Sequence, residues 1–464
     1  MPGEAVSINP ANGRLVGTYP LMSEAEIQDT LITAEAGQRE WAGLSPQSRA
    51  EHLRRLGSVL SARREALARM ITLEMGKPIT LALGEIDKCA NLCGWYARHS
   101  DRLLADETSD FGSEGIATVR YLPLGIVLAV MPWNFPIWQV LRAAVPIMAS
   151  GNGLLLKHAD NVQGCAAALA DCFSTAGFPE GAFCVVNTGR EVTSDLLRDH
   201  RICGVSVTAG VAAGSALAAE AGRNLKKSLL ELGGSDPFIV LPDADLERAV
   251  SQAVMARFQN CGQVCIAAKR FIVHDEIFDT FVEKFVEQAG HIKVGDPLER
   301  STEMGPMARE RLRAEIHALV MQSREQGARI LLGGEIPDGP GSFYPPTVLV
   351  DVTNDMPVCR QEAFGPVAPI LKANDIDHAV ELANDSEFGL SSSIWTEDVC
   401  LAGQIAPRIE AGAVYVNRIS ASDPRVPIGG IKASGYGREL SHFGLKEFCN
   451  AQVHWVSCIQ SSNH

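Results

Sequence analysis

Apolar residues recur with helical spacing through the first hundred residues of the chain. Ser23 and Glu26 have the spacing of a capping box, and an amphipathic run extends from them to Trp41. Ser45 and Pro46 then supply an N-cap and a proline at the first position of a second helix. We therefore expect residues 1–100 to form helices.

The pattern changes at about Ile116 to short apolar runs separated by glycine and proline. Gly125–Met131 and Gly153–Lys157 are nearly continuous apolar runs, which are typical of strands buried on both faces of a parallel sheet. Further strands and helices alternate after them: a helix over 162–175, strands over 183–187 and 204–208, and a helix opened by Gly214. This alternation predicts a doubly wound α/β domain.

A second alternation of the same kind begins after Gly234 and continues to about residue 445. Its first members are strands over 238–241 and 270–273 and helices over 244–259 and 276–289. Two α/β halves without a low-complexity linker indicate two domains that pack across a cleft, which is where a ligand usually binds.

Length and charge narrow the class of protein. With 464 residues the chain is too long for one core, so two or three domains are expected. The net charge of -14 argues against a nucleic-acid groove or an anionic membrane surface, because both require clustered Lys and Arg. The N-terminus lacks the features of a targeting peptide, and no apolar run is long enough to cross a membrane. We expect a cytoplasmic protein that binds neither nucleic acid nor membrane.

The cysteines raise two questions, metal binding and catalysis. Twelve cysteines without a signal peptide favour reduced thiols, and we expect no metal site because Cys89 and Cys93 have no second pair and no HExxH motif occurs. The apolar-periodic helix that leads to Cys261 and Cys265 runs into the stop signals Asn260 and Gly262, which places Cys265 on a turn. A nucleophilic thiolate needs such a setting, but an isolated cysteine is also often a small buried hydrophobe. Local pattern alone leaves both interpretations open.

Several motifs together resemble the aldehyde dehydrogenase superfamily over nearly the whole chain. Each motif is weak alone, but their order and spacing are specific. They cover residues 74–78 (EMGKP), 132–136 (PWNFP), 231–237 (ELGGSDP), 263–265 (QVC), 362–366 (EAFGP) and 435–439 (GYGRE). Within the superfamily, residues 420–423 and 435–444 are similar to the shorter bacterial succinate-semialdehyde dehydrogenases.

The resemblance implies an α/β fold with two doubly wound domains and a small β oligomerisation segment. On this basis the cofactor-binding domain comprises residues 1–104 and 124–232, and the catalytic domain comprises residues 233–445. Residues 105–123 and 446–464 form the oligomerisation segment of a homodimer or homotetramer, and the alternation of Gln452–Val456 suits a strand edge that needs a partner.

The resemblance also implies the chemistry. Cys265 attacks an aldehyde to give a thiohemiacetal, a hydride leaves to the nicotinamide, and a thioester remains. The Asn134 amide and the Cys265 backbone N–H hold the oxyanion, and Glu231 activates the water that hydrolyses the thioester. Cys261 is expected to pack inside its helix, with a reversible disulfide to Cys265 as an alternative. An alternative for Glu231 is a carboxylate paired with the lysines at positions 226 and 227.

The cofactor is expected to be NAD, with NADP possible. Asp160 suits a ribose hydroxyl and repels a 2′-phosphate, whereas Lys157 would tolerate one. Where the family usually shows Thr-Gly-Ser, this chain has Thr208-Ala-Gly, so we expect weaker cofactor binding. For Lys157 and Glu362 a surface ion pair is the alternative. The full set of expected cofactor contacts is Trp133, Lys157, Asp160, Gly210, Gly214, Leu232, Glu362 and Phe364.

The substrate is expected to be succinate semialdehyde, which would be oxidised to succinate. Its carboxylate needs a cation or hydrogen-bond donors at the far end of the pocket, and we assign Trp138, Gln139, Arg418 and Ser422 to this role, with Ser420 and Arg425 close by in sequence. Another small aliphatic or hydroxy aldehyde is an alternative substrate. A catalytically silent structural protein of the same fold is the alternative from another functional class.

Overall fold

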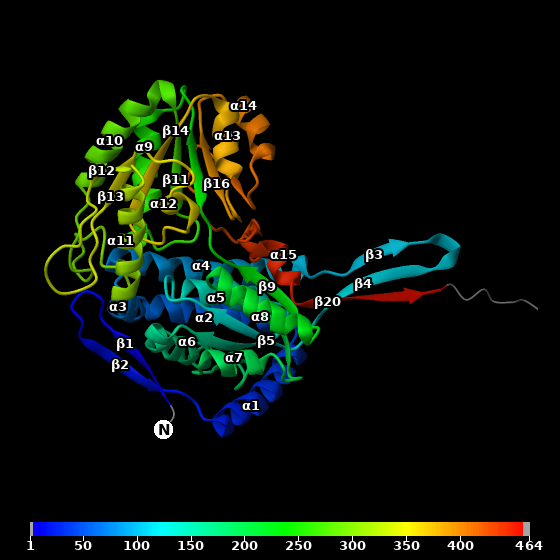
Figure 1. The fold of residues 1–464 in the computed structure, drawn as a ribbon. Coiled ribbons are helices and arrows are strands. Elements are labelled where there is room, and N and C mark those ends of the chain that lie inside the picture. Colours follow the sequence, from blue (N-terminus) through cyan, green and yellow to red (C-terminus); the bar gives the residue numbers. More distant parts are fainter. Residues whose placement is uncertain (1–2, 458–464) are drawn as a thin grey trace, which may run out of the picture.

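The computed structural model describes residues 3–457 of the chain, and these form two α/β bodies and a projecting β arm (Figure 1). Each body is built on one mainly parallel sheet with helices on both faces. The expected α/β class with two doubly wound sheets is therefore confirmed.

The first body contains a six-stranded sheet in the order β19-β9-β8-β5-β6-β7, parallel except at the β19–β9 pair. The predicted apolar runs are strands, and they are buried on both faces. Ile126 and Leu128 pack with α1, α7 and α8, whereas Val127 and Ala129 pack with α2 to α6 on the opposite face. The strands are β5 (Ile126–Met131), β6 (Gly153–His158), β7 (Phe183–Val185), β8 (Ile202–Thr208), β9 (Lys227–Glu231) and β19 (Gly435–Tyr436).

Eight helices of the first body precede the second sheet in sequence. The capping box at Ser23 and the Ser45–Pro46 helix start are both present as predicted. One helix start differs: α8 begins at Val211 with Gly210 as its N-cap, so Gly214 lies one turn inside it. The helices are α1 (Glu24–Gly43), α2 (Pro46–Ala62), α3 (Arg64–Met75), α4 (Ile79–Leu103), α5 (Trp138–Ala149), α6 (Gln163–Thr175), α7 (Arg190–Leu196) and α8 (Val211–Arg223).

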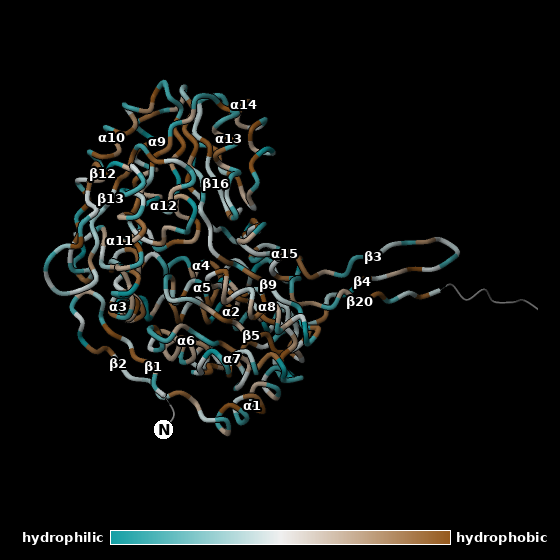
Figure 2. The backbone as a smooth tube through the Cα atoms, viewed as in Figure 1, coloured by the Kyte–Doolittle hydropathy of each residue, from teal (hydrophilic) through white to brown (hydrophobic). Residues whose placement is uncertain are grey.

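The second body contains a seven-stranded sheet in the order β12-β13-β14-β11-β10-β16-β17, parallel except at the β12–β13 pair. Its strands are β10 (Asp236–Val240), β11 (Ala268–His274), β12 (Arg329–Leu332), β13 (Thr347–Val350), β14 (Val367–Ala373), β16 (Ser392–Trp395) and β17 (Val414–Val416). Hydrophobic segments run through this sheet and the helices against it (Figure 2).

The helices of the second body lie on both faces of its sheet. They are α9 (Leu246–Phe258), α10 (Phe278–Gly290), α11 (Glu310–Glu325), α12 (Pro357–Arg360), α13 (Ile376–Asn384) and α14 (Val399–Ile405). The chain then returns to the first body, where β19 pairs with β9 and α15 (Ser441–Lys446) packs against α5. This return adds β19 to the edge of the first sheet, next to β9.

Among the described residues, three small sheets lie outside the two main sheets. The expectation that residues 1–100 are helical is wrong at its start, because β1 (Glu4–Ile8) and β2 (Leu15–Pro20) form a hairpin there. The arm is a three-stranded antiparallel sheet of β3 (Glu107–Asp110), β4 (Ile116–Pro123) and β20 (Cys449–Val456), and it projects away from both bodies (Figure 1). Residues 458–464 of the expected oligomerisation segment lie outside the described residues. A short pair, β15 (Phe388–Gly389) and β18 (Ile431–Lys432), completes the strands.

None of the helices within residues 3–457 is long and apolar enough to span a bilayer.

Candidate active site

The turn that carries Cys265 is fixed by an unusual run of backbone conformations. Helix α9 stops at Phe258, and Asn260, Cys261 and Gly262 then have positive φ values of 51°, 57° and 70°. A Cβ atom at Gly262 would lie 2.2 Å from the carbonyl oxygen of Gly365, so only glycine fits this close approach. The predicted helix end and turn are confirmed, but Cys261 lies in the left-handed turn and not inside the helix.

Arg257 holds this turn against the neighbouring segment. Its buried guanidinium donates to the carbonyl oxygens of Gly262 at 2.9 Å, Gly365 at 2.5 Å and Ala268 at 3.0 Å. It also donates to the carbonyl oxygen of Ala363 at 3.1 Å. Four backbone acceptors therefore share one cation, which fixes the position of the thiol-bearing turn relative to β11.

The two cysteines of the turn have different surroundings. Cys261 packs into the core of the second body, and burial raises the pKa of its thiol to about 12. Cys265 lines a cavity of about 310 Å³ between the two bodies. Burial raises the pKa of the Cys265 thiol to about 11, and the positive charges of Arg142 and Lys269 oppose that rise. Only Cys265 is therefore open to a ligand.

Asn134 is tied directly to the same turn. It lies in the loop between β5 and α5, and its Nδ2 donates to the carbonyl oxygen of Gln263 at 2.9 Å. In return, Asn260 Nδ2 donates to the Asn134 carbonyl oxygen at 2.9 Å. Because an amide nitrogen carries two hydrogens, Asn134 keeps one N–H beyond this bond. The loop and the thiol turn thus form one hydrogen-bonded unit across the two bodies.

Glu231 ends β9 and is almost completely buried. Burial raises the pKa of its carboxyl to about 7, against the attraction of Arg142, and the charge of Glu439 raises it further. Arg142 Nη2 lies 3.5 Å from Glu231, and the same guanidinium forms an ion pair with Glu439. The alternative pairing of Glu231 with lysine is wrong: Lys226 donates to the Asp199 carbonyl and Lys227 pairs with Glu447.

The cavity beside Cys265 also contains residues expected to contact the substrate. Trp138, Gln139, Ser420 and Ser422 all line it. Arg418 does not line it; its guanidinium lies 5.6 Å from the centroid of the Tyr415 ring. Arg425 is exposed and forms an ion pair with Asp423 at 2.8 Å. Lys88 lines the cavity without having been anticipated from the sequence.

The residues expected to hold the nicotinamide half of the cofactor lie together. Trp133 and Phe364 meet edge to face, with ring centroids 5.8 Å apart. Glu362 accepts from the Gly234 backbone N–H at 3.1 Å and pairs with the buried Lys269 at 3.1 Å, so it is not part of a surface ion pair. A Cβ at Gly233 would lie 2.3 Å from the Glu362 carboxylate, which explains the glycine.

The other half of the expected cofactor site lies at the edge of the first sheet. Helix α8 has no side-chain N-cap and no acidic residue in its first turn, so the free N–H groups after Gly210 suit a pyrophosphate. Gly214 packs closely on Leu232, since a Cβ there would lie 2.3 Å from a methyl group of that side chain. Lys157 and Asp160 pair at 3.1 Å at the end of β6, with Asp160 largely exposed. These residues fit a dinucleotide.

The motif at residues 74–78 contacts helices that lie next to the site. Glu74 accepts from the backbone N–H groups of Gly164 and Cys165 at 2.9 Å each, and so caps α6. Lys77 forms a fully buried ion pair with Glu85. Glu85 also accepts from the N–H groups that start α5, next to the Asn134 loop. This motif therefore has a structural role in positioning two helices.

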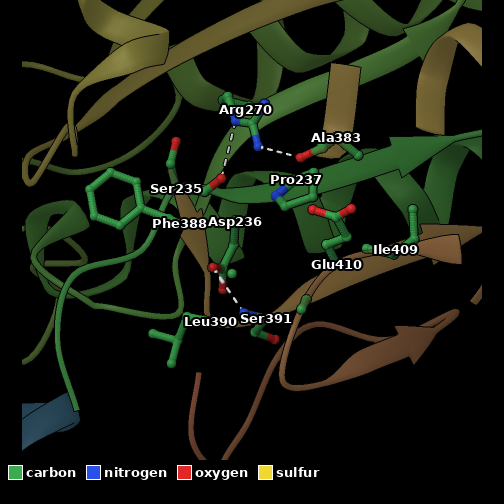
Figure 3. A pocket seen from close by; sticks show the side chains of 12 residues that line it. Ser235, Asp236, Pro237, Arg270, Ala383, Phe388, Leu390, Ser391, Ile409 and Glu410 are labelled. Carbon is green, nitrogen blue, oxygen red and sulfur yellow. Dashed lines mark hydrogen bonds between the residues drawn. The ribbon is translucent and has the colours of Figure 1, made fainter. Parts of the chain in front are cut away.

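A second, much smaller cavity is separate from this site. Figure 3 shows it beside Asp236 and Arg270, at the start of β10. Its volume of about 10 Å³ suits one water molecule. Ser391 N–H donates to Asp236 at 3.1 Å, and burial raises the pKa of Asp236 to about 8. None of the residues expected in the site lines this cavity.

Three cations near the nucleophile had not been predicted from the sequence: Lys88, Arg142 and Lys269. Arg142 could have been found, since it is the only charged residue in the mostly apolar α5. Lys269 and Arg270 are two adjacent cations in an otherwise mostly apolar strand, which is a similar signal. Lys88 lies among polar and apolar residues of α4 and carries no local signal.

This arrangement of sheets, thiol turn, amide loop and buried carboxylate is that of an aldehyde dehydrogenase. The chain belongs to the aldehyde dehydrogenase family, whose profile matches residues 3–454. It is 53% identical over 455 residues to "Succinate semialdehyde dehydrogenase [NAD(P)+] Sad" of Escherichia coli K12, covering 98% of both chains. It is 46% identical over 460 residues to "Succinate-semialdehyde dehydrogenase [NADP(+)]" of Mycobacterium avium, again covering 98% of each.

Solved structures give the same assignment. The succinic semialdehyde dehydrogenase from Streptococcus pyogenes, in complex with NADP+, superposes with a TM-score of 0.95 at 34% identity, over 98% of this chain and all of that chain. The family resemblance expected from the motifs is confirmed, and the protein is an aldehyde dehydrogenase.

Proposed function

We propose that this enzyme oxidises succinate semialdehyde to succinate with NAD or NADP in the cytoplasm, as a homodimer or homotetramer. The observation that carries the proposal is the cavity that Cys265 shares with a set of polar residues, in a chain 53% identical to a succinate semialdehyde dehydrogenase. The free state of all eleven cysteines among the described residues supports a reducing compartment.

The proposed chemistry uses three groups of the chain. The Cys265 thiolate adds to the aldehyde carbon, and the second N–H of Asn134 together with the Cys265 backbone N–H stabilises the oxyanion that forms. The nicotinamide supplies a hydride acceptor when the cofactor is bound. Collapse of the oxyanion then leaves a thioester on Cys265. Glu231 takes a proton from water, which attacks the thioester and releases the acid and the thiol.

The buried position of Glu231 supports hydrolysis over transfer to coenzyme A. A carboxyl with a pKa of about 7 is ionised in half of the molecules near neutral pH and can accept a proton from water. For the cofactor, Asp160 supports NAD, because a carboxylate repels a 2′-phosphate, while its pairing with Lys157 weakens that repulsion. Relatives named as NADP enzymes make both cofactors worth testing.

An assay with purified protein tests the proposal. NADH or NADPH formation is followed with two- to five-carbon aldehydes, with and without coenzyme A. We expect the highest kcat/KM with succinate semialdehyde and no requirement for coenzyme A. A higher kcat/KM for another small aldehyde would replace the substrate, and absence of turnover with any aldehyde would favour a silent scaffold.

Two cysteine variants test the nucleophile. Cys265→Ala is expected to lower turnover by about a thousand-fold or more, because no other thiol lines the cavity. Cys261→Ala, the matched control, is expected to retain activity, since Cys261 only packs in the core. The reverse pattern would overturn the assignment. The alternative of a reversible disulfide predicts that oxidative inactivation disappears in Cys261→Ala.

A further inference from the structure

Lys269 is a buried lysine next to the nucleophile that takes no part in the proposed chemistry. It is the second residue of β11, and its side chain is completely buried. It does not line the cavity beside Cys265. Because a buried ammonium is costly unless it is paired and hydrogen-bonded, the partners of Lys269 show what it holds in place.

The ammonium of Lys269 bridges two segments of the site. It donates to the carbonyl oxygen of Cys265 at 2.5 Å and pairs with Glu362 Oε1 at 3.1 Å. Cys265 belongs to the turn after α9, whereas Glu362 lies in the loop between α12 and β14. One cation thus links the residue that bears the thiol to a residue expected to contact the nicotinamide ribose.

The two carboxylate oxygens of Glu362 have different surroundings. Lys269 and the backbone N–H of Gly234 both bind Oε1, at 3.1 Å each. The Glu362 side chain is nevertheless 21% exposed. Oε2 is therefore the oxygen that remains for a ribose hydroxyl, and the bond from Lys269 fixes the direction in which it points.

The fold of the thiol turn does not depend on Lys269, because Arg257 already holds it. The Arg257 guanidinium binds four backbone carbonyl oxygens of the turn and of the segments beside it. None of the four belongs to Cys265 or Glu362. The bond from Lys269 therefore adds a constraint on the nucleophile itself.

We propose that Lys269 is a positioning residue of the reaction: its ammonium fixes the Cys265 backbone relative to Glu362, and its charge stabilises the thiolate. The proposal rests on the proposed function, which makes Cys265 the nucleophile and Glu362 a cofactor contact. Lys269 touches neither the aldehyde nor the reacting atoms, and it acts through these two neighbours.

The charge of Lys269 acts on the thiol at close range. Burial raises the pKa of the Cys265 thiol, and the positive charges of Arg142 and Lys269 oppose that rise. The negative charges of Glu231 and Glu362 add to it. Removing the charge of Lys269 should therefore raise the pKa further and lower the thiolate fraction at neutral pH.

Alkylation of the cofactor-free enzyme by iodoacetamide measures this effect without turnover. At pH 8 the thiol is far below its pKa of about 11, so the rate follows the thiolate fraction. Lys269→Gln keeps a donor for the Cys265 carbonyl but loses the charge. We expect its alkylation rate at Cys265, followed by peptide mass spectrometry, to fall about 10-fold, as for loss of one nearby charge. Lys269→Arg keeps the charge and should stay within about three-fold of the wild type.

Cofactor binding gives a second readout, measured as the Kd from a fluorescence titration with NAD and, in parallel, NADP. In Lys269→Met we expect the Kd to rise about 10-fold, as for loss of a hydrogen bond to a charged group. In a Glu362→Gln background the same change should have little further effect, because Lys269 acts on the ribose through Glu362. A merely structural role would give an equal loss in both backgrounds. If Lys269→Met does not fold, as judged by circular dichroism, Lys269→Gln replaces it in the titration.

Lys226→Met is the matched control. Lys226 also donates to a backbone carbonyl oxygen, but it precedes β9 and so lies at the opposite end of that strand from Glu231. This variant should leave both the alkylation rate and the Kd unchanged.

The outcomes separate the two proposals. A wild-type alkylation rate in Lys269→Gln, or the same loss of cofactor affinity with and without Glu362, would overturn the role of Lys269 and leave the proposed function intact. Neither measurement uses an aldehyde, so the role of Lys269 stands if another aldehyde replaces succinate semialdehyde. Full turnover in Cys265→Ala would overturn both proposals.

Discussion

At the scale of single residues, the site is organised by buried cations that each hold a carboxylate or a carbonyl in place. Arg142 lies between Glu231 and Glu439, and Lys269 lies between Glu362 and the carbonyl oxygen of Cys265, at 3.1 Å and 2.5 Å. A buried carboxylate without such a partner would be protonated at neutral pH. Arg142 therefore favours the ionised form of Glu231, against the effect of burial.

Glu231 gives the sharpest prediction at this scale. Because burial raises its pKa to about 7, the ionised fraction grows as the pH rises through 7. Hydrolysis of the thioester, measured as kcat by rapid-mixing and steady-state kinetics, should increase over the same range and then level off. In Glu231→Gln we expect kcat to fall by about 100- to 1,000-fold, with a burst of reduced cofactor retained.

Glu439 provides the matched control. Its negative charge raises the pKa of Glu231, so Glu439→Gln should move the midpoint of the pH profile downwards. It should also leave Arg142 free to pair with Glu231 alone. An unchanged midpoint in this variant, or a burst that vanishes in Glu231→Gln, would show that Glu231 is not the base for hydrolysis.

At the scale of elements, the sequence predicted those helices and strands that a local pattern of apolar residues determines. Runs such as that of β5 could be identified because both of their faces are buried, so every position is apolar. The β1–β2 hairpin was missed because its strands are short and bury few apolar side chains. Strand β19 is two residues long and pairs with β9 from a distant part of the chain, which no local pattern reveals.

In the site, too, features set by local sequence could be predicted, and contacts between distant parts of the chain could not. The turn at Cys265 follows from helix-stopping residues and could be predicted, and the motif order pointed to the roles proposed for Asn134 and Glu231. The pairing of Arg142 with Glu439 could not be predicted, because residues almost 300 positions apart meet only through the return of the chain to the first body. The position of Arg418 beside the Tyr415 ring, and not in the lining of the cavity, likewise could not be predicted from local pattern.

A substitution at Gly262 tests whether the turn that carries Cys265 must keep its conformation. Its φ of 70° and the 2.2 Å approach to the Gly365 carbonyl mean that Gly262→Ala must shift the turn. We expect a loss of about 2 kcal/mol or more in the free energy of unfolding, measured by urea denaturation, and a large fall in kcat.

The control for this change is Gly403→Ala inside α14. No atom lies within 4 Å of a Cβ built there, and its φ is not positive. Replacing a helix-interior glycine with alanine should stabilise the protein by about 0.5–1 kcal/mol and leave kcat unchanged. If Gly262→Ala behaved in the same way, the close approach at the turn would not be a requirement for activity.

At the scale of the whole molecule, the arm has no core of its own. Seven of the eight residues of β20 are exposed, and within residues 3–457 the strand pairs only with β4, which leaves its other edge without a partner strand there. Val453, Trp455 and Val456 are 60%, 48% and 71% exposed. A projecting three-stranded sheet with apolar side chains and an unpaired edge is stable in water when a partner covers it. This supports the proposal that the arm joins copies of the chain.

Val453→Asp tests this role directly. A buried, unpaired aspartate would weaken an interface through this strand by several kcal/mol, so sedimentation velocity should show smaller particles than for the wild type at equal concentration. Val399→Asp is the matched control, because Val399 is equally exposed at 63% but lies at the start of α14, far from the arm (Figure 1). A monomeric wild type would contradict the oligomer, and an unchanged assembly in Val453→Asp would place the interface elsewhere. Because the arm contacts neither Cys265 nor its cavity, an active monomer in Val453→Asp would show that each chain contains a complete site.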